Sequence, residues 1–555
     1  HKHSTTTSTT TKVLLETQRK LVYEATLSED LLDETVDDTT NTIWRNHTFH
    51  GYSPSGTLHN KKFVYANYGR PQDFEVLEEL GISVQGKIVV MRYGKCFRGL
   101  KVYQTQIRGG VGAILYSDPQ DDGYTIGKVY PNGPWRSSSS VQRGSVQFIS
   151  HCGGDPYRID SRYQTLLNTT VEQLCGVNTS DIVPFIPSIP ISYGDVIPLL
   201  QNLGGPLVDE IPSAIENQFA GGLTNISYRI GPSKGYLDLV VDNIDKIVNI
   251  PNVIGLIPGS LPASKDQPVL LGNHRDAWIY GAADPNSGTA ALLEVAKGFG
   301  ALYRDHQWRP LRSIYFCSWS GEEYGLVGST GWAELNMEPR TAATENNSVL
   351  KRSLVYLNTD TIVSGDRLKV SASPSLIPLW KSVLSDLENE PLPPSSWLIS
   401  TSNSNNDNDS NTNDVDSGSG ISMNNSRFLA NVTIHDANTD WEVRDNDHDD
   451  TSYYGTTSHY HANTNNVGVL GSGSDYTVFL DHFGIPSLDF SYHNKYAQYG
   501  QYHSVYDSFS WMDKYGGCSS KSDDDDETCD AFELMEFASK IWGLLAMRLA
   551  TSSVV

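Results

Sequence analysis

The second half of the chain alternates short apolar segments with longer amphipathic segments. The apolar segments predict strands at 253–256, 269–271, 314–319, 354–358 and 487–490, and the amphipathic segments predict helices at 288–303, 326–335, 376–387 and 532–549. This alternation favours an α/β fold in which helices flank a mixed, mostly parallel sheet. With 555 residues the chain is too long for one ordinary core, so we expect at least two domains.

The region 38–248 has a different composition. It is rich in Gly, Pro and β-branched residues, has few segments of helical period, and carries predicted strands at 86–90, 113–116 and within 182–191. These features indicate a compact β-rich module. We expect 12–37 to supply the first strands of the main domain, although a helix is an alternative at 12–27, where Val22 and Ala25 also fit a 3.6-residue period. The module would then be inserted into a main domain that 249–555 completes.

The net charge of −24 argues against nucleic acid as a partner, because nucleic-acid binding needs a basic surface. Part of the acidity is local: 401–466 is a low-complexity Asn/Ser/Asp-rich insertion, and 523–527 is an acidic run. We interpret both as solvated loops. No apolar run reaches the roughly 18 residues that a membrane span needs. A Ser/Thr-rich leader that begins at His1 is expected of a processed or excised piece, and the upstream part could hold a signal or an anchor.

Glycosylation sequons and cysteines favour the secretory pathway. The eight Asn-x-Ser/Thr sites are Asn46, Asn168, Asn178, Asn225, Asn346, Asn408, Asn424 and Asn431. Six cysteines allow up to three disulfides. Cys518 and Cys529 flank the acidic run and could close it as a loop, whereas Cys317 lies in an apolar predicted strand and is expected to be a buried thiol.

Side chains that bind divalent cations recur where the predicted strands end. They lie in the segments 272–276, 283–288 and 320–325, and two more follow at Asp360 and His503. Functional crevices of open α/β sheets form outside the carboxyl ends of the strands, so these side chains are expected to converge. One His, a bridging Asp, a Glu, a second Asp and a second His would form a two-zinc hydrolytic centre.

Each of these residues also has a simpler interpretation. His274 and Asp276 project from the same face of a strand, so Asp276 could accept the second N–H of a metal-bound imidazole, but the pair could equally be ordinary surface residues. Asp284 could instead cap the helix that follows it. We predict that the peptide bond after Asp284 is cis and directs its carboxylate toward the metals.

The adjacent pair Glu322 and Glu323 follows an apolar strand and lies between two glycines. Adjacent side chains point in different directions, so one carboxylate could bind zinc while the other takes a proton from water. The simpler interpretation is a solvated acidic loop. Asp360 ends a strand, where an uncompensated carboxylate would be costly. His503, taken alone, is better explained as a hydrogen-bonded structural histidine.

With these residues in order, the chain resembles the zinc metallopeptidases of the glutamate carboxypeptidase and transferrin receptor group. The nearest pattern is that of prostate-specific membrane antigen and the fungal vacuolar-sorting members. The resemblance runs from about residue 62 to the last residue and is interrupted by the low-complexity insertion. It includes 86–90 and 116–119, which are similar to a protease-associated (apical) domain, and also 332–334 and 470–475.

The resemblance implies a centre of two zinc ions. His274 and Asp360 would hold one ion, and Glu323 and His503 would hold the other. Asp284 would bridge the two.

The resemblance also implies roles for residues that are not ligands. Glu322 would be the general base, and the hydroxyl of Tyr502 would stabilise the oxyanion. Arg143 matches the family arginine that clasps the C-terminal carboxylate of the substrate, a task that suits a bidentate guanidinium.

The predicted substrate pocket departs from the family pattern. Asp489 and Ser491 stand where glutamate-releasing members have arginines, and Ser474 replaces an Asn in the wall that Ser472 and Gly473 also form. A preference for an acidic residue before the cleaved bond is therefore not expected, and Asp489 could favour a basic or amino-terminal group.

Three further departures follow. Arg229 stands where an Asn helps to bind the released residue, and Gly331 replaces a carboxylate of the family calcium site and leaves only Glu334. Calcium is thus a weak expectation. The chain also stops where the helical dimerisation domain of the family would begin.

These observations predict a di-zinc exopeptidase, with carboxypeptidase activity favoured by Arg143 and aminopeptidase activity left open by Asp489. A non-catalytic receptor or sorting protein on the same scaffold is the alternative from another class. The expected partners are a peptide substrate, N-linked glycans and, in the full-length protein, a second copy in a homodimer. We expect a lumenal or extracellular protein, vacuolar or at the cell surface, which could be membrane-anchored upstream of this chain.

Overall fold

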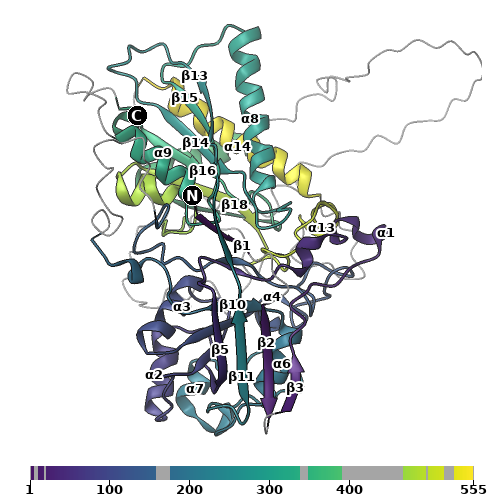
Figure 1. Cartoon of the computed structure of the whole chain (residues 1–555). Coiled ribbons are helices and arrows are strands. Elements are labelled where there is room, and N and C mark those ends of the chain that lie inside the picture. Colours follow the sequence, from purple (N-terminus) through teal and green to yellow (C-terminus); the bar gives the residue numbers. More distant parts are fainter. Residues whose placement is uncertain are drawn as a thin grey trace, which may run out of the picture.

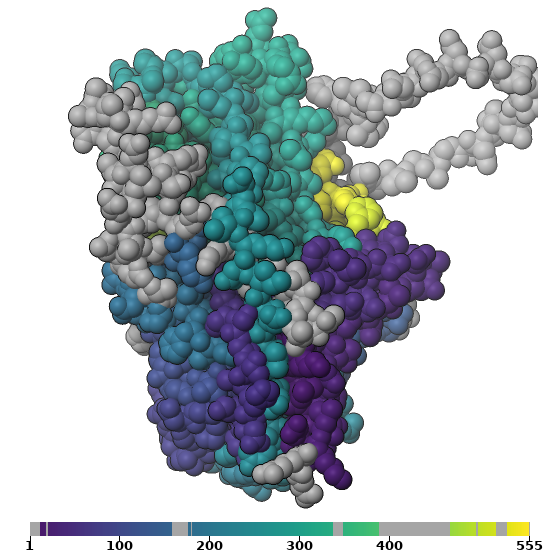
Figure 2. Space-filling model, in the orientation of Figure 1, coloured from purple at the N-terminus to yellow at the C-terminus, as the bar shows by residue number. Residues whose placement is uncertain are grey.

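The computed structural model describes residues 2–5, 11–17, 20–157, 176–337, 348–389, 467–494, 498–517 and 530–553. They form two regions (Figure 1). We call the described residues of 11–241 the apical region and those of 253–553 the main region. Figure 2 shows them packed against each other, with the teal segment around β11 passing from one to the other. The insertion at 401–466 and the loop between Cys518 and Cys529 lie outside the described residues.

The main region is built on one six-stranded sheet with the order β13-β15-β14-β16-β18-β17. The four inner strands are parallel: β15 (Ile314–Trp319), β14 (Val269–His274), β16 (Val355–Asn358) and β18 (Ser487–His493). The edge strands β13 (Val253–Ile257) and β17 (Arg367–Ala372) are antiparallel to their neighbours. This confirms the mixed, mostly parallel sheet. Strand β17 was not predicted, because one of its faces is polar and it has no continuous apolar run.

Helices cover both faces of this sheet, so the inner strands are mostly buried on both faces. In β14, Val269 and Leu271 pack in one cluster with α8 (Asn286–Asp305), α11 (Ile377–Asn389) and α14 (Ala531–Thr551), whereas Leu270 packs on the other face beside α9 (Val327–Met337). Cys317 is a buried free thiol on that second face, as predicted.

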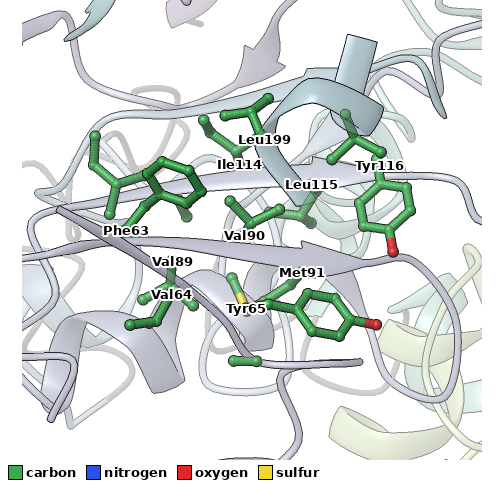
Figure 3. Close-up of a cluster of buried hydrophobic side chains, with 14 of the residues drawn as sticks. Phe63, Val64, Tyr65, Val89, Val90, Met91, Ile114, Leu115, Tyr116 and Leu199 are labelled. Carbon is green, nitrogen blue, oxygen red and sulfur yellow. The ribbon is translucent and has the colours of Figure 1, made fainter. Parts of the chain in front are cut away.

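The apical region contains two four-stranded sheets that share one core. The first, β10-β8-β7-β6, is parallel and comprises Ser188–Ile191, Gly112–Tyr116, Ile88–Arg92 and Phe63–Tyr65. The second, β3-β2-β11-β5, is antiparallel and comprises Lys20–Glu24, Lys12–Thr17, Tyr236–Val241 and Gly56–Lys61. Figure 3 shows part of this core: Ile114 of β8 lies close to Leu199 of α6, and Val64 of β6 lies close to Val89 of β7.

One expectation about this region was wrong. Residues 12–24 do form strands, but β2 pairs with β11, and Val13 and Leu15 join the apical core, so these strands are not part of the main sheet. The alternation of buried and exposed residues predicts a strand but does not identify its partner. The module is β-rich, as expected, and α2 (Pro71–Glu79), α3 (Arg98–Ile107) and α6 (Tyr193–Gln201) cover its parallel sheet.

Short elements complete the chain. Two small ribbons pair β1 (Lys2–Thr5) with β12 (Ile244–Ile247) and β4 (His50–Gly51) with β9 (Gly144–Ser145). The short helices are α1 (Glu34–Asp37), α4 (Pro119–Asp122), α7 (Pro212–Glu216), α10 (Val349–Arg352) and α13 (Phe509–Tyr515). Within the described ranges, no helix combines the length and apolar character that a membrane span requires.

Candidate metal centre

The five predicted ligands lie at one edge of the main sheet. His274 is the last residue of β14, and Asp360 follows the neighbouring strand β16. Glu323 lies in the turn after β15, and Asp284 lies in the turn before α8. His503 comes from the segment between β18 and α13. Because β15, β14 and β16 are parallel neighbours, their carboxyl ends bring these turns together.

The ligand atoms form two groups that share Asp284. In the first group, Nε2 of His274 lies 2.8 Å from Oδ1 of Asp360 and 3.4 Å from Oδ1 of Asp284. In the second, Nε2 of His503 lies 3.2 Å from Oδ2 of Asp284 and 3.3 Å from Oε2 of Glu323. Within each group the ligand atoms lie within 4.8 Å of one another. All five predicted ligands therefore converge, with the predicted partition between the groups.

The chemistry of these side chains fits divalent cations. Oδ1 of Asp284 and Oε1 of Glu323 are buried and make no hydrogen bond. The pKa values of Glu322 and Glu323 lie well above the ordinary value. Burial is the main cause, and repulsion from neighbouring carboxylates adds to it. Protein groups alone thus do not compensate the carboxylates of Glu322 and Glu323 when both are ionised. Imidazole and carboxylate ligands are those that zinc binds, so the residues fit zinc.

The imidazoles respond to the same surroundings in opposite ways. Burial by itself disfavours the charged form of both rings, and it lowers the pKa of His503 to about 4. For His274 the nearby carboxylates of Asp360 and Glu322 outweigh burial, and its pKa lies well above the ordinary value. A bound divalent cation would compete with those protons for Nε2, because only the neutral imidazole is a ligand.

Asp276 orients the glutamate pair more than it orients His274. Nδ1 of His274 lies 2.9 Å from the main-chain oxygen of Asp276, whereas its carboxylate is 3.7 Å away. That carboxylate instead accepts N–H groups from Gly321, Glu322 and Glu323 at 2.7, 3.1 and 3.2 Å. The predicted role of Asp276 as an outer partner of the centre is thus refined: it fixes the turn that carries Glu322 and Glu323.

The turn before α8 has the predicted form. The peptide bond between Asp284 and Pro285 is cis. The helix-cap alternative for Asp284 is wrong, because the N-cap position is Pro285 and has no side-chain cap. Asp507, which sequence reasoning missed, accepts the main-chain N–H groups of Ala283 and Asp284 at 2.8 and 3.2 Å. Burial raises the pKa of Asp507 to about 7. No sequence pattern links Asp507 to that distant turn.

The main chain of Arg143 holds His503 in place. Nδ1 of His503 donates to the carbonyl oxygen of Arg143 at 3.0 Å, and the Arg143 N–H donates to the carbonyl oxygen of His503 at 3.2 Å. With Nδ1 protonated, Nε2 carries the lone pair that faces Asp284 and Glu323. The apical region thus sets the orientation of one candidate ligand.

Glu322 and Tyr502 flank the ligand groups. Oε2 of Glu322 lies 4.0 Å from Nε2 of His274, while its neighbour Glu323 faces His503, so the two carboxylates do point to different places. The ring of Tyr502 stacks on the His503 ring with centroids 3.6 Å apart, and its hydroxyl lies 3.4 Å from Nη2 of Arg98.

The predicted substrate-binding role of Arg143 is contradicted. Its side chain is fully buried, and Nη2 lies 2.7 Å from Oε2 of Glu29. The remaining guanidinium N–H groups donate to main-chain carbonyl oxygens, among them that of His47 at 2.8 Å. Glu29, which the sequence gave no reason to select, occupies the anion-binding face that a substrate carboxylate would need.

Arg229 is likewise engaged elsewhere. Its Nη1 donates to the carbonyl oxygen of Gly205 at 2.7 Å within the apical region. Among the described residues, the structure gives it no contact with the candidate ligands. The expectation that Arg229 lines the site is therefore not supported by its position.

The predicted wall formed by residues 472–474 is connected to the centre. Ser474 donates to Oδ2 of Asp360 at 2.8 Å, and Asn358 donates to Ser474 at 3.1 Å and to Asp489 at 2.8 Å. The hydroxyl of Thr477 lies 3.4 Å from both the Gly473 nitrogen and the Ser472 hydroxyl, so it holds the loop. Burial raises the pKa of Asp489 to about 7.

In the part of the chain that the structure describes, groups of three or more His, Cys, Asp or Glu side chains able to hold a metal ion occur only at this centre.

Comparison with known proteins agrees with this geometry. Residues 252–393 match peptidase family M28, and residues 53–149 match the PA domain. The chain is 38% identical over 552 residues to a probable glutamate carboxypeptidase of Arthroderma benhamiae, covering 96% of this chain and 62% of that protein. It is 31% identical to the aminopeptidase NAALADL1 of Mus musculus, covering 84% of this chain and 54% of the relative.

A third relative is named for sorting. Vacuolar protein sorting-associated protein 70 of Saccharomyces cerevisiae is 31% identical, with 89% of this chain and 52% of that protein covered. This chain spans little more than half the length of these relatives. The two matches agree with the structure. The PA match falls in the apical region, and the M28 match falls in the main region that carries the ligand groups. The chain therefore combines a peptidase family M28 region with a PA domain.

Proposed function

We propose that the protein is a zinc-dependent exopeptidase with a two-ion centre. The observation that supports this most directly is the shared Asp284, whose two oxygens face one histidine in each ligand group. A single-ion site would not need a carboxylate between two sets of ligands. The relatives named carboxypeptidases and aminopeptidases support peptide hydrolysis near a chain terminus.

The side chains around the ligands have distinct proposed roles. His274 and Asp360 would hold one ion, Glu323 and His503 the other, and Asp284 both. Zinc in such sites polarises a carbonyl group and lowers the pKa of water.

Two residues would serve the reaction without holding zinc. Glu322 would accept the proton of the attacking water and pass it to the leaving nitrogen. Tyr502 would donate a hydrogen bond to the carbonyl oxygen as that oxygen gains charge.

Carboxypeptidase action remains our first proposal, although Arg143 no longer supports it. It depends on the relatives named glutamate carboxypeptidases. An aminopeptidase with the same centre is favoured by the relative NAALADL1 and by the carboxylate of Asp489 near the centre, which could attract a free amino group. Peptides blocked at one terminus separate the two: a carboxypeptidase cleaves N-acetylated peptides and an aminopeptidase cleaves C-amidated ones.

The decisive experiment measures cleavage of a dipeptide panel by the full-length protein, with zinc content determined by mass spectrometry. We expect cleavage that a chelator abolishes and zinc restores. Glu322→Gln should retain zinc and lose about 10²–10⁴-fold in kcat, because it removes a general base without removing a ligand. Glu294→Gln, on the exposed surface of α8, is the matched control.

If the zinc-loaded protein cleaves no peptide, the exopeptidase proposal is overturned in favour of a non-catalytic receptor or sorting protein. The relative named for vacuolar protein sorting makes that the second candidate.

The setting of the protein is also proposed. The relative named for vacuolar protein sorting supports a secretory or vacuolar protein. Asn46, Asn178 and Asn225 are exposed sequons that could carry glycans, whereas Asn168, Asn346, Asn408, Asn424 and Asn431 lie outside the described residues. A homodimer of the full-length protein and an upstream membrane anchor remain proposals.

A further inference from the structure

Arg98 brings a buried cation from the apical region to the candidate metal centre. It is the first residue of α3, and only 9% of it is exposed. Its Nη2 lies 3.4 Å from each of three atoms: Oε1 of Gln142, the hydroxyl of Tyr502 and Nδ1 of His503. The side chain thus reaches residues about 400 positions later in the chain.

Arg98 differs from the other buried arginines of the apical region. Arg92, Arg136 and Arg143 each lie within 4.0 Å of a carboxylate, at 3.8, 2.6 and 2.7 Å. Among the described residues Arg98 has no such ion pair, and its Nε makes no hydrogen bond. A buried guanidinium without a carboxylate is costly, so a purely structural role does not explain it.

The backbone around Arg98 is shaped to admit the guanidinium. Gly144 has a φ of +157°, and a Cβ there would lie 2.3 Å from Nε of Arg98. A Cβ at Gly99 would lie 2.4 Å from the carbonyl oxygen of Gln147. The start of α3 therefore packs directly on the segment that contains Arg143, whose main chain holds His503.

The donors and acceptors leave one arrangement for Tyr502. His503 donates from Nδ1 to Arg143, so that nitrogen cannot also accept from Arg98. Arg98 can only donate, and the acceptors left within 3.4 Å of its Nη2 are Oε1 of Gln142 and the Tyr502 oxygen. When the Tyr502 oxygen accepts from Arg98, its own hydrogen must point away from the guanidinium.

The Tyr502 ring cannot turn to escape this arrangement. It is stacked on the His503 ring at 3.6 Å between centroids and tilted by 23°. In the described structure, Arg98 is the only hydrogen-bond partner of the hydroxyl. The phenol hydrogen is thus left for an acceptor other than Arg98.

We propose that Arg98 is a positioning residue that turns Tyr502 into a one-directional hydrogen-bond donor toward the reacting carbonyl oxygen. A charge-assisted hydrogen bond to the phenol oxygen also polarises the O–H group and strengthens its donation. The PA domain thereby contributes to the stabilisation of charge in the reaction. This inference depends on the proposed peptidase function.

A double-mutant cycle in the full-length protein tests it, with the best-cleaved dipeptide of the panel as the substrate. Tyr502→Phe should lower kcat by about 10²–10³-fold, as the loss of one oxyanion donor does. Arg98→Met should lower kcat by about 10–100-fold with KM changed less than about threefold, and should have almost no effect in the Tyr502→Phe background. Arg98→Lys should recover part of the loss.

Arg108→Met is the matched control, because Arg108 lies at the other end of α3 and pairs with Glu78. It should leave kcat unchanged. If Arg98→Met does not fold, Arg98→Lys takes its place in the cycle.

A second readout does not depend on turnover. A phosphinate analogue of the same dipeptide has a tetrahedral oxyanion and should bind Arg98→Lys and Arg98→Met about 10-fold or more weakly than the wild-type protein, by calorimetry. The zinc content of both variants should equal that of the wild type.

The inference is overturned if Arg98→Met lowers kcat equally in the wild-type and the Tyr502→Phe proteins. Loss of zinc in Arg98→Lys would also overturn it, because Arg98 would then act on the ligand His503. Absence of cleavage by the wild-type protein would instead reject the proposed function and this inference with it.

Discussion

Buried charge is compensated in different ways in the apical region and at the candidate metal centre. In the apical region, Arg136 faces Asp122 at 2.6 Å and Arg143 faces Glu29 at 2.7 Å. At the centre, the carboxylates gather around two imidazoles, and one buried oxygen each of Asp284 and Glu323 makes no hydrogen bond. Buried carboxylates that no side chain of the protein neutralises indicate a site for a bound cation, whereas a buried arginine paired with a carboxylate indicates a structural role.

This comparison explains why Arg143 misled the sequence interpretation. A motif can preserve an arginine while its side chain serves a different purpose, and a long-range partner decides which purpose it is. Glu29 lies 114 positions before Arg143 in the sequence, and nothing in the local pattern of either residue indicates their ion pair.

The largest expected effect comes from removing the carboxylate that both ligand groups share. Asp284→Asn should lower the zinc content and reduce kcat/KM on the order of 10³-fold or more, because a shared ligand serves both ions. Metal analysis and dipeptide cleavage measure both quantities. Asp305→Asn, at the exposed end of the same helix, should change neither. Full zinc content in Asp284→Asn would show that the centre does not need this carboxylate to hold a cation, and the contrast with the paired arginines of the apical region would fail.

The next effect concerns stability. Arg143→Met should lower the free energy of unfolding by about 3–5 kcal/mol, because it leaves Glu29 as a buried, unpaired carboxylate. Denaturant unfolding measures the loss, and Glu29→Gln in the same protein should recover part of it. An increase in KM without loss of stability would instead restore the substrate-binding role of Arg143.

A third effect depends on pH. Burial raises the pKa of Asp121 from 3.8 to about 7, with Arg92 opposing the shift. Between these values the folded protein binds more protons than the unfolded chain, so stability falls as the pH rises. Asp121→Asn should therefore match the wild type near pH 4 and exceed its stability by roughly 2–4 kcal/mol at pH 8.

Thermal unfolding across that pH range measures the difference. Asp209→Asn, an exposed position in the same region, should show no pH-dependent difference from the wild type. A stability difference for Asp121→Asn that does not change with pH would show that the carboxyl group is not the cause.

The smallest effect tests the pocket. Asp489→Asn should change the ratio of kcat/KM for peptides with an acidic or a basic residue before the cleaved bond by about three- to tenfold, in favour of the acidic one. Because the pKa of Asp489 is about 7, this difference from the wild type should be present at pH 8 and should fade near pH 5.5. An unchanged ratio at both pH values would remove Asp489 from the pocket.

The sequence predicted the main sheet and the placing of candidate ligands at its strand ends because both depend on local pattern, whereas the full ligand set, His503 above all, came from the resemblance to a family. His274 and Glu323 lie at or just after apolar strands, and parallel neighbours bring strand ends together without further information. The partners of β2 and of Arg98 could not be predicted in this way. They depend on which distant surfaces meet, and hydrophobic periodicity carries no information about that.

Helix α3 was missed for a related reason. Its residues include Val102 and Thr105, which are β-branched and buried, so its composition resembles that of the neighbouring strands. Its helical conformation becomes clear only from its position over the parallel apical sheet.

The reciprocal main-chain contact between Arg143 and His503 has a consequence for biosynthesis. The candidate ligands are spread from residue 274 to residue 503, and the one that completes the second group is oriented by a segment made some 360 residues earlier. On the ribosome, the segment around Arg143 is therefore made long before the imidazole that it orients. Under the proposed two-ion centre, the second ion would bind only after the two regions have docked.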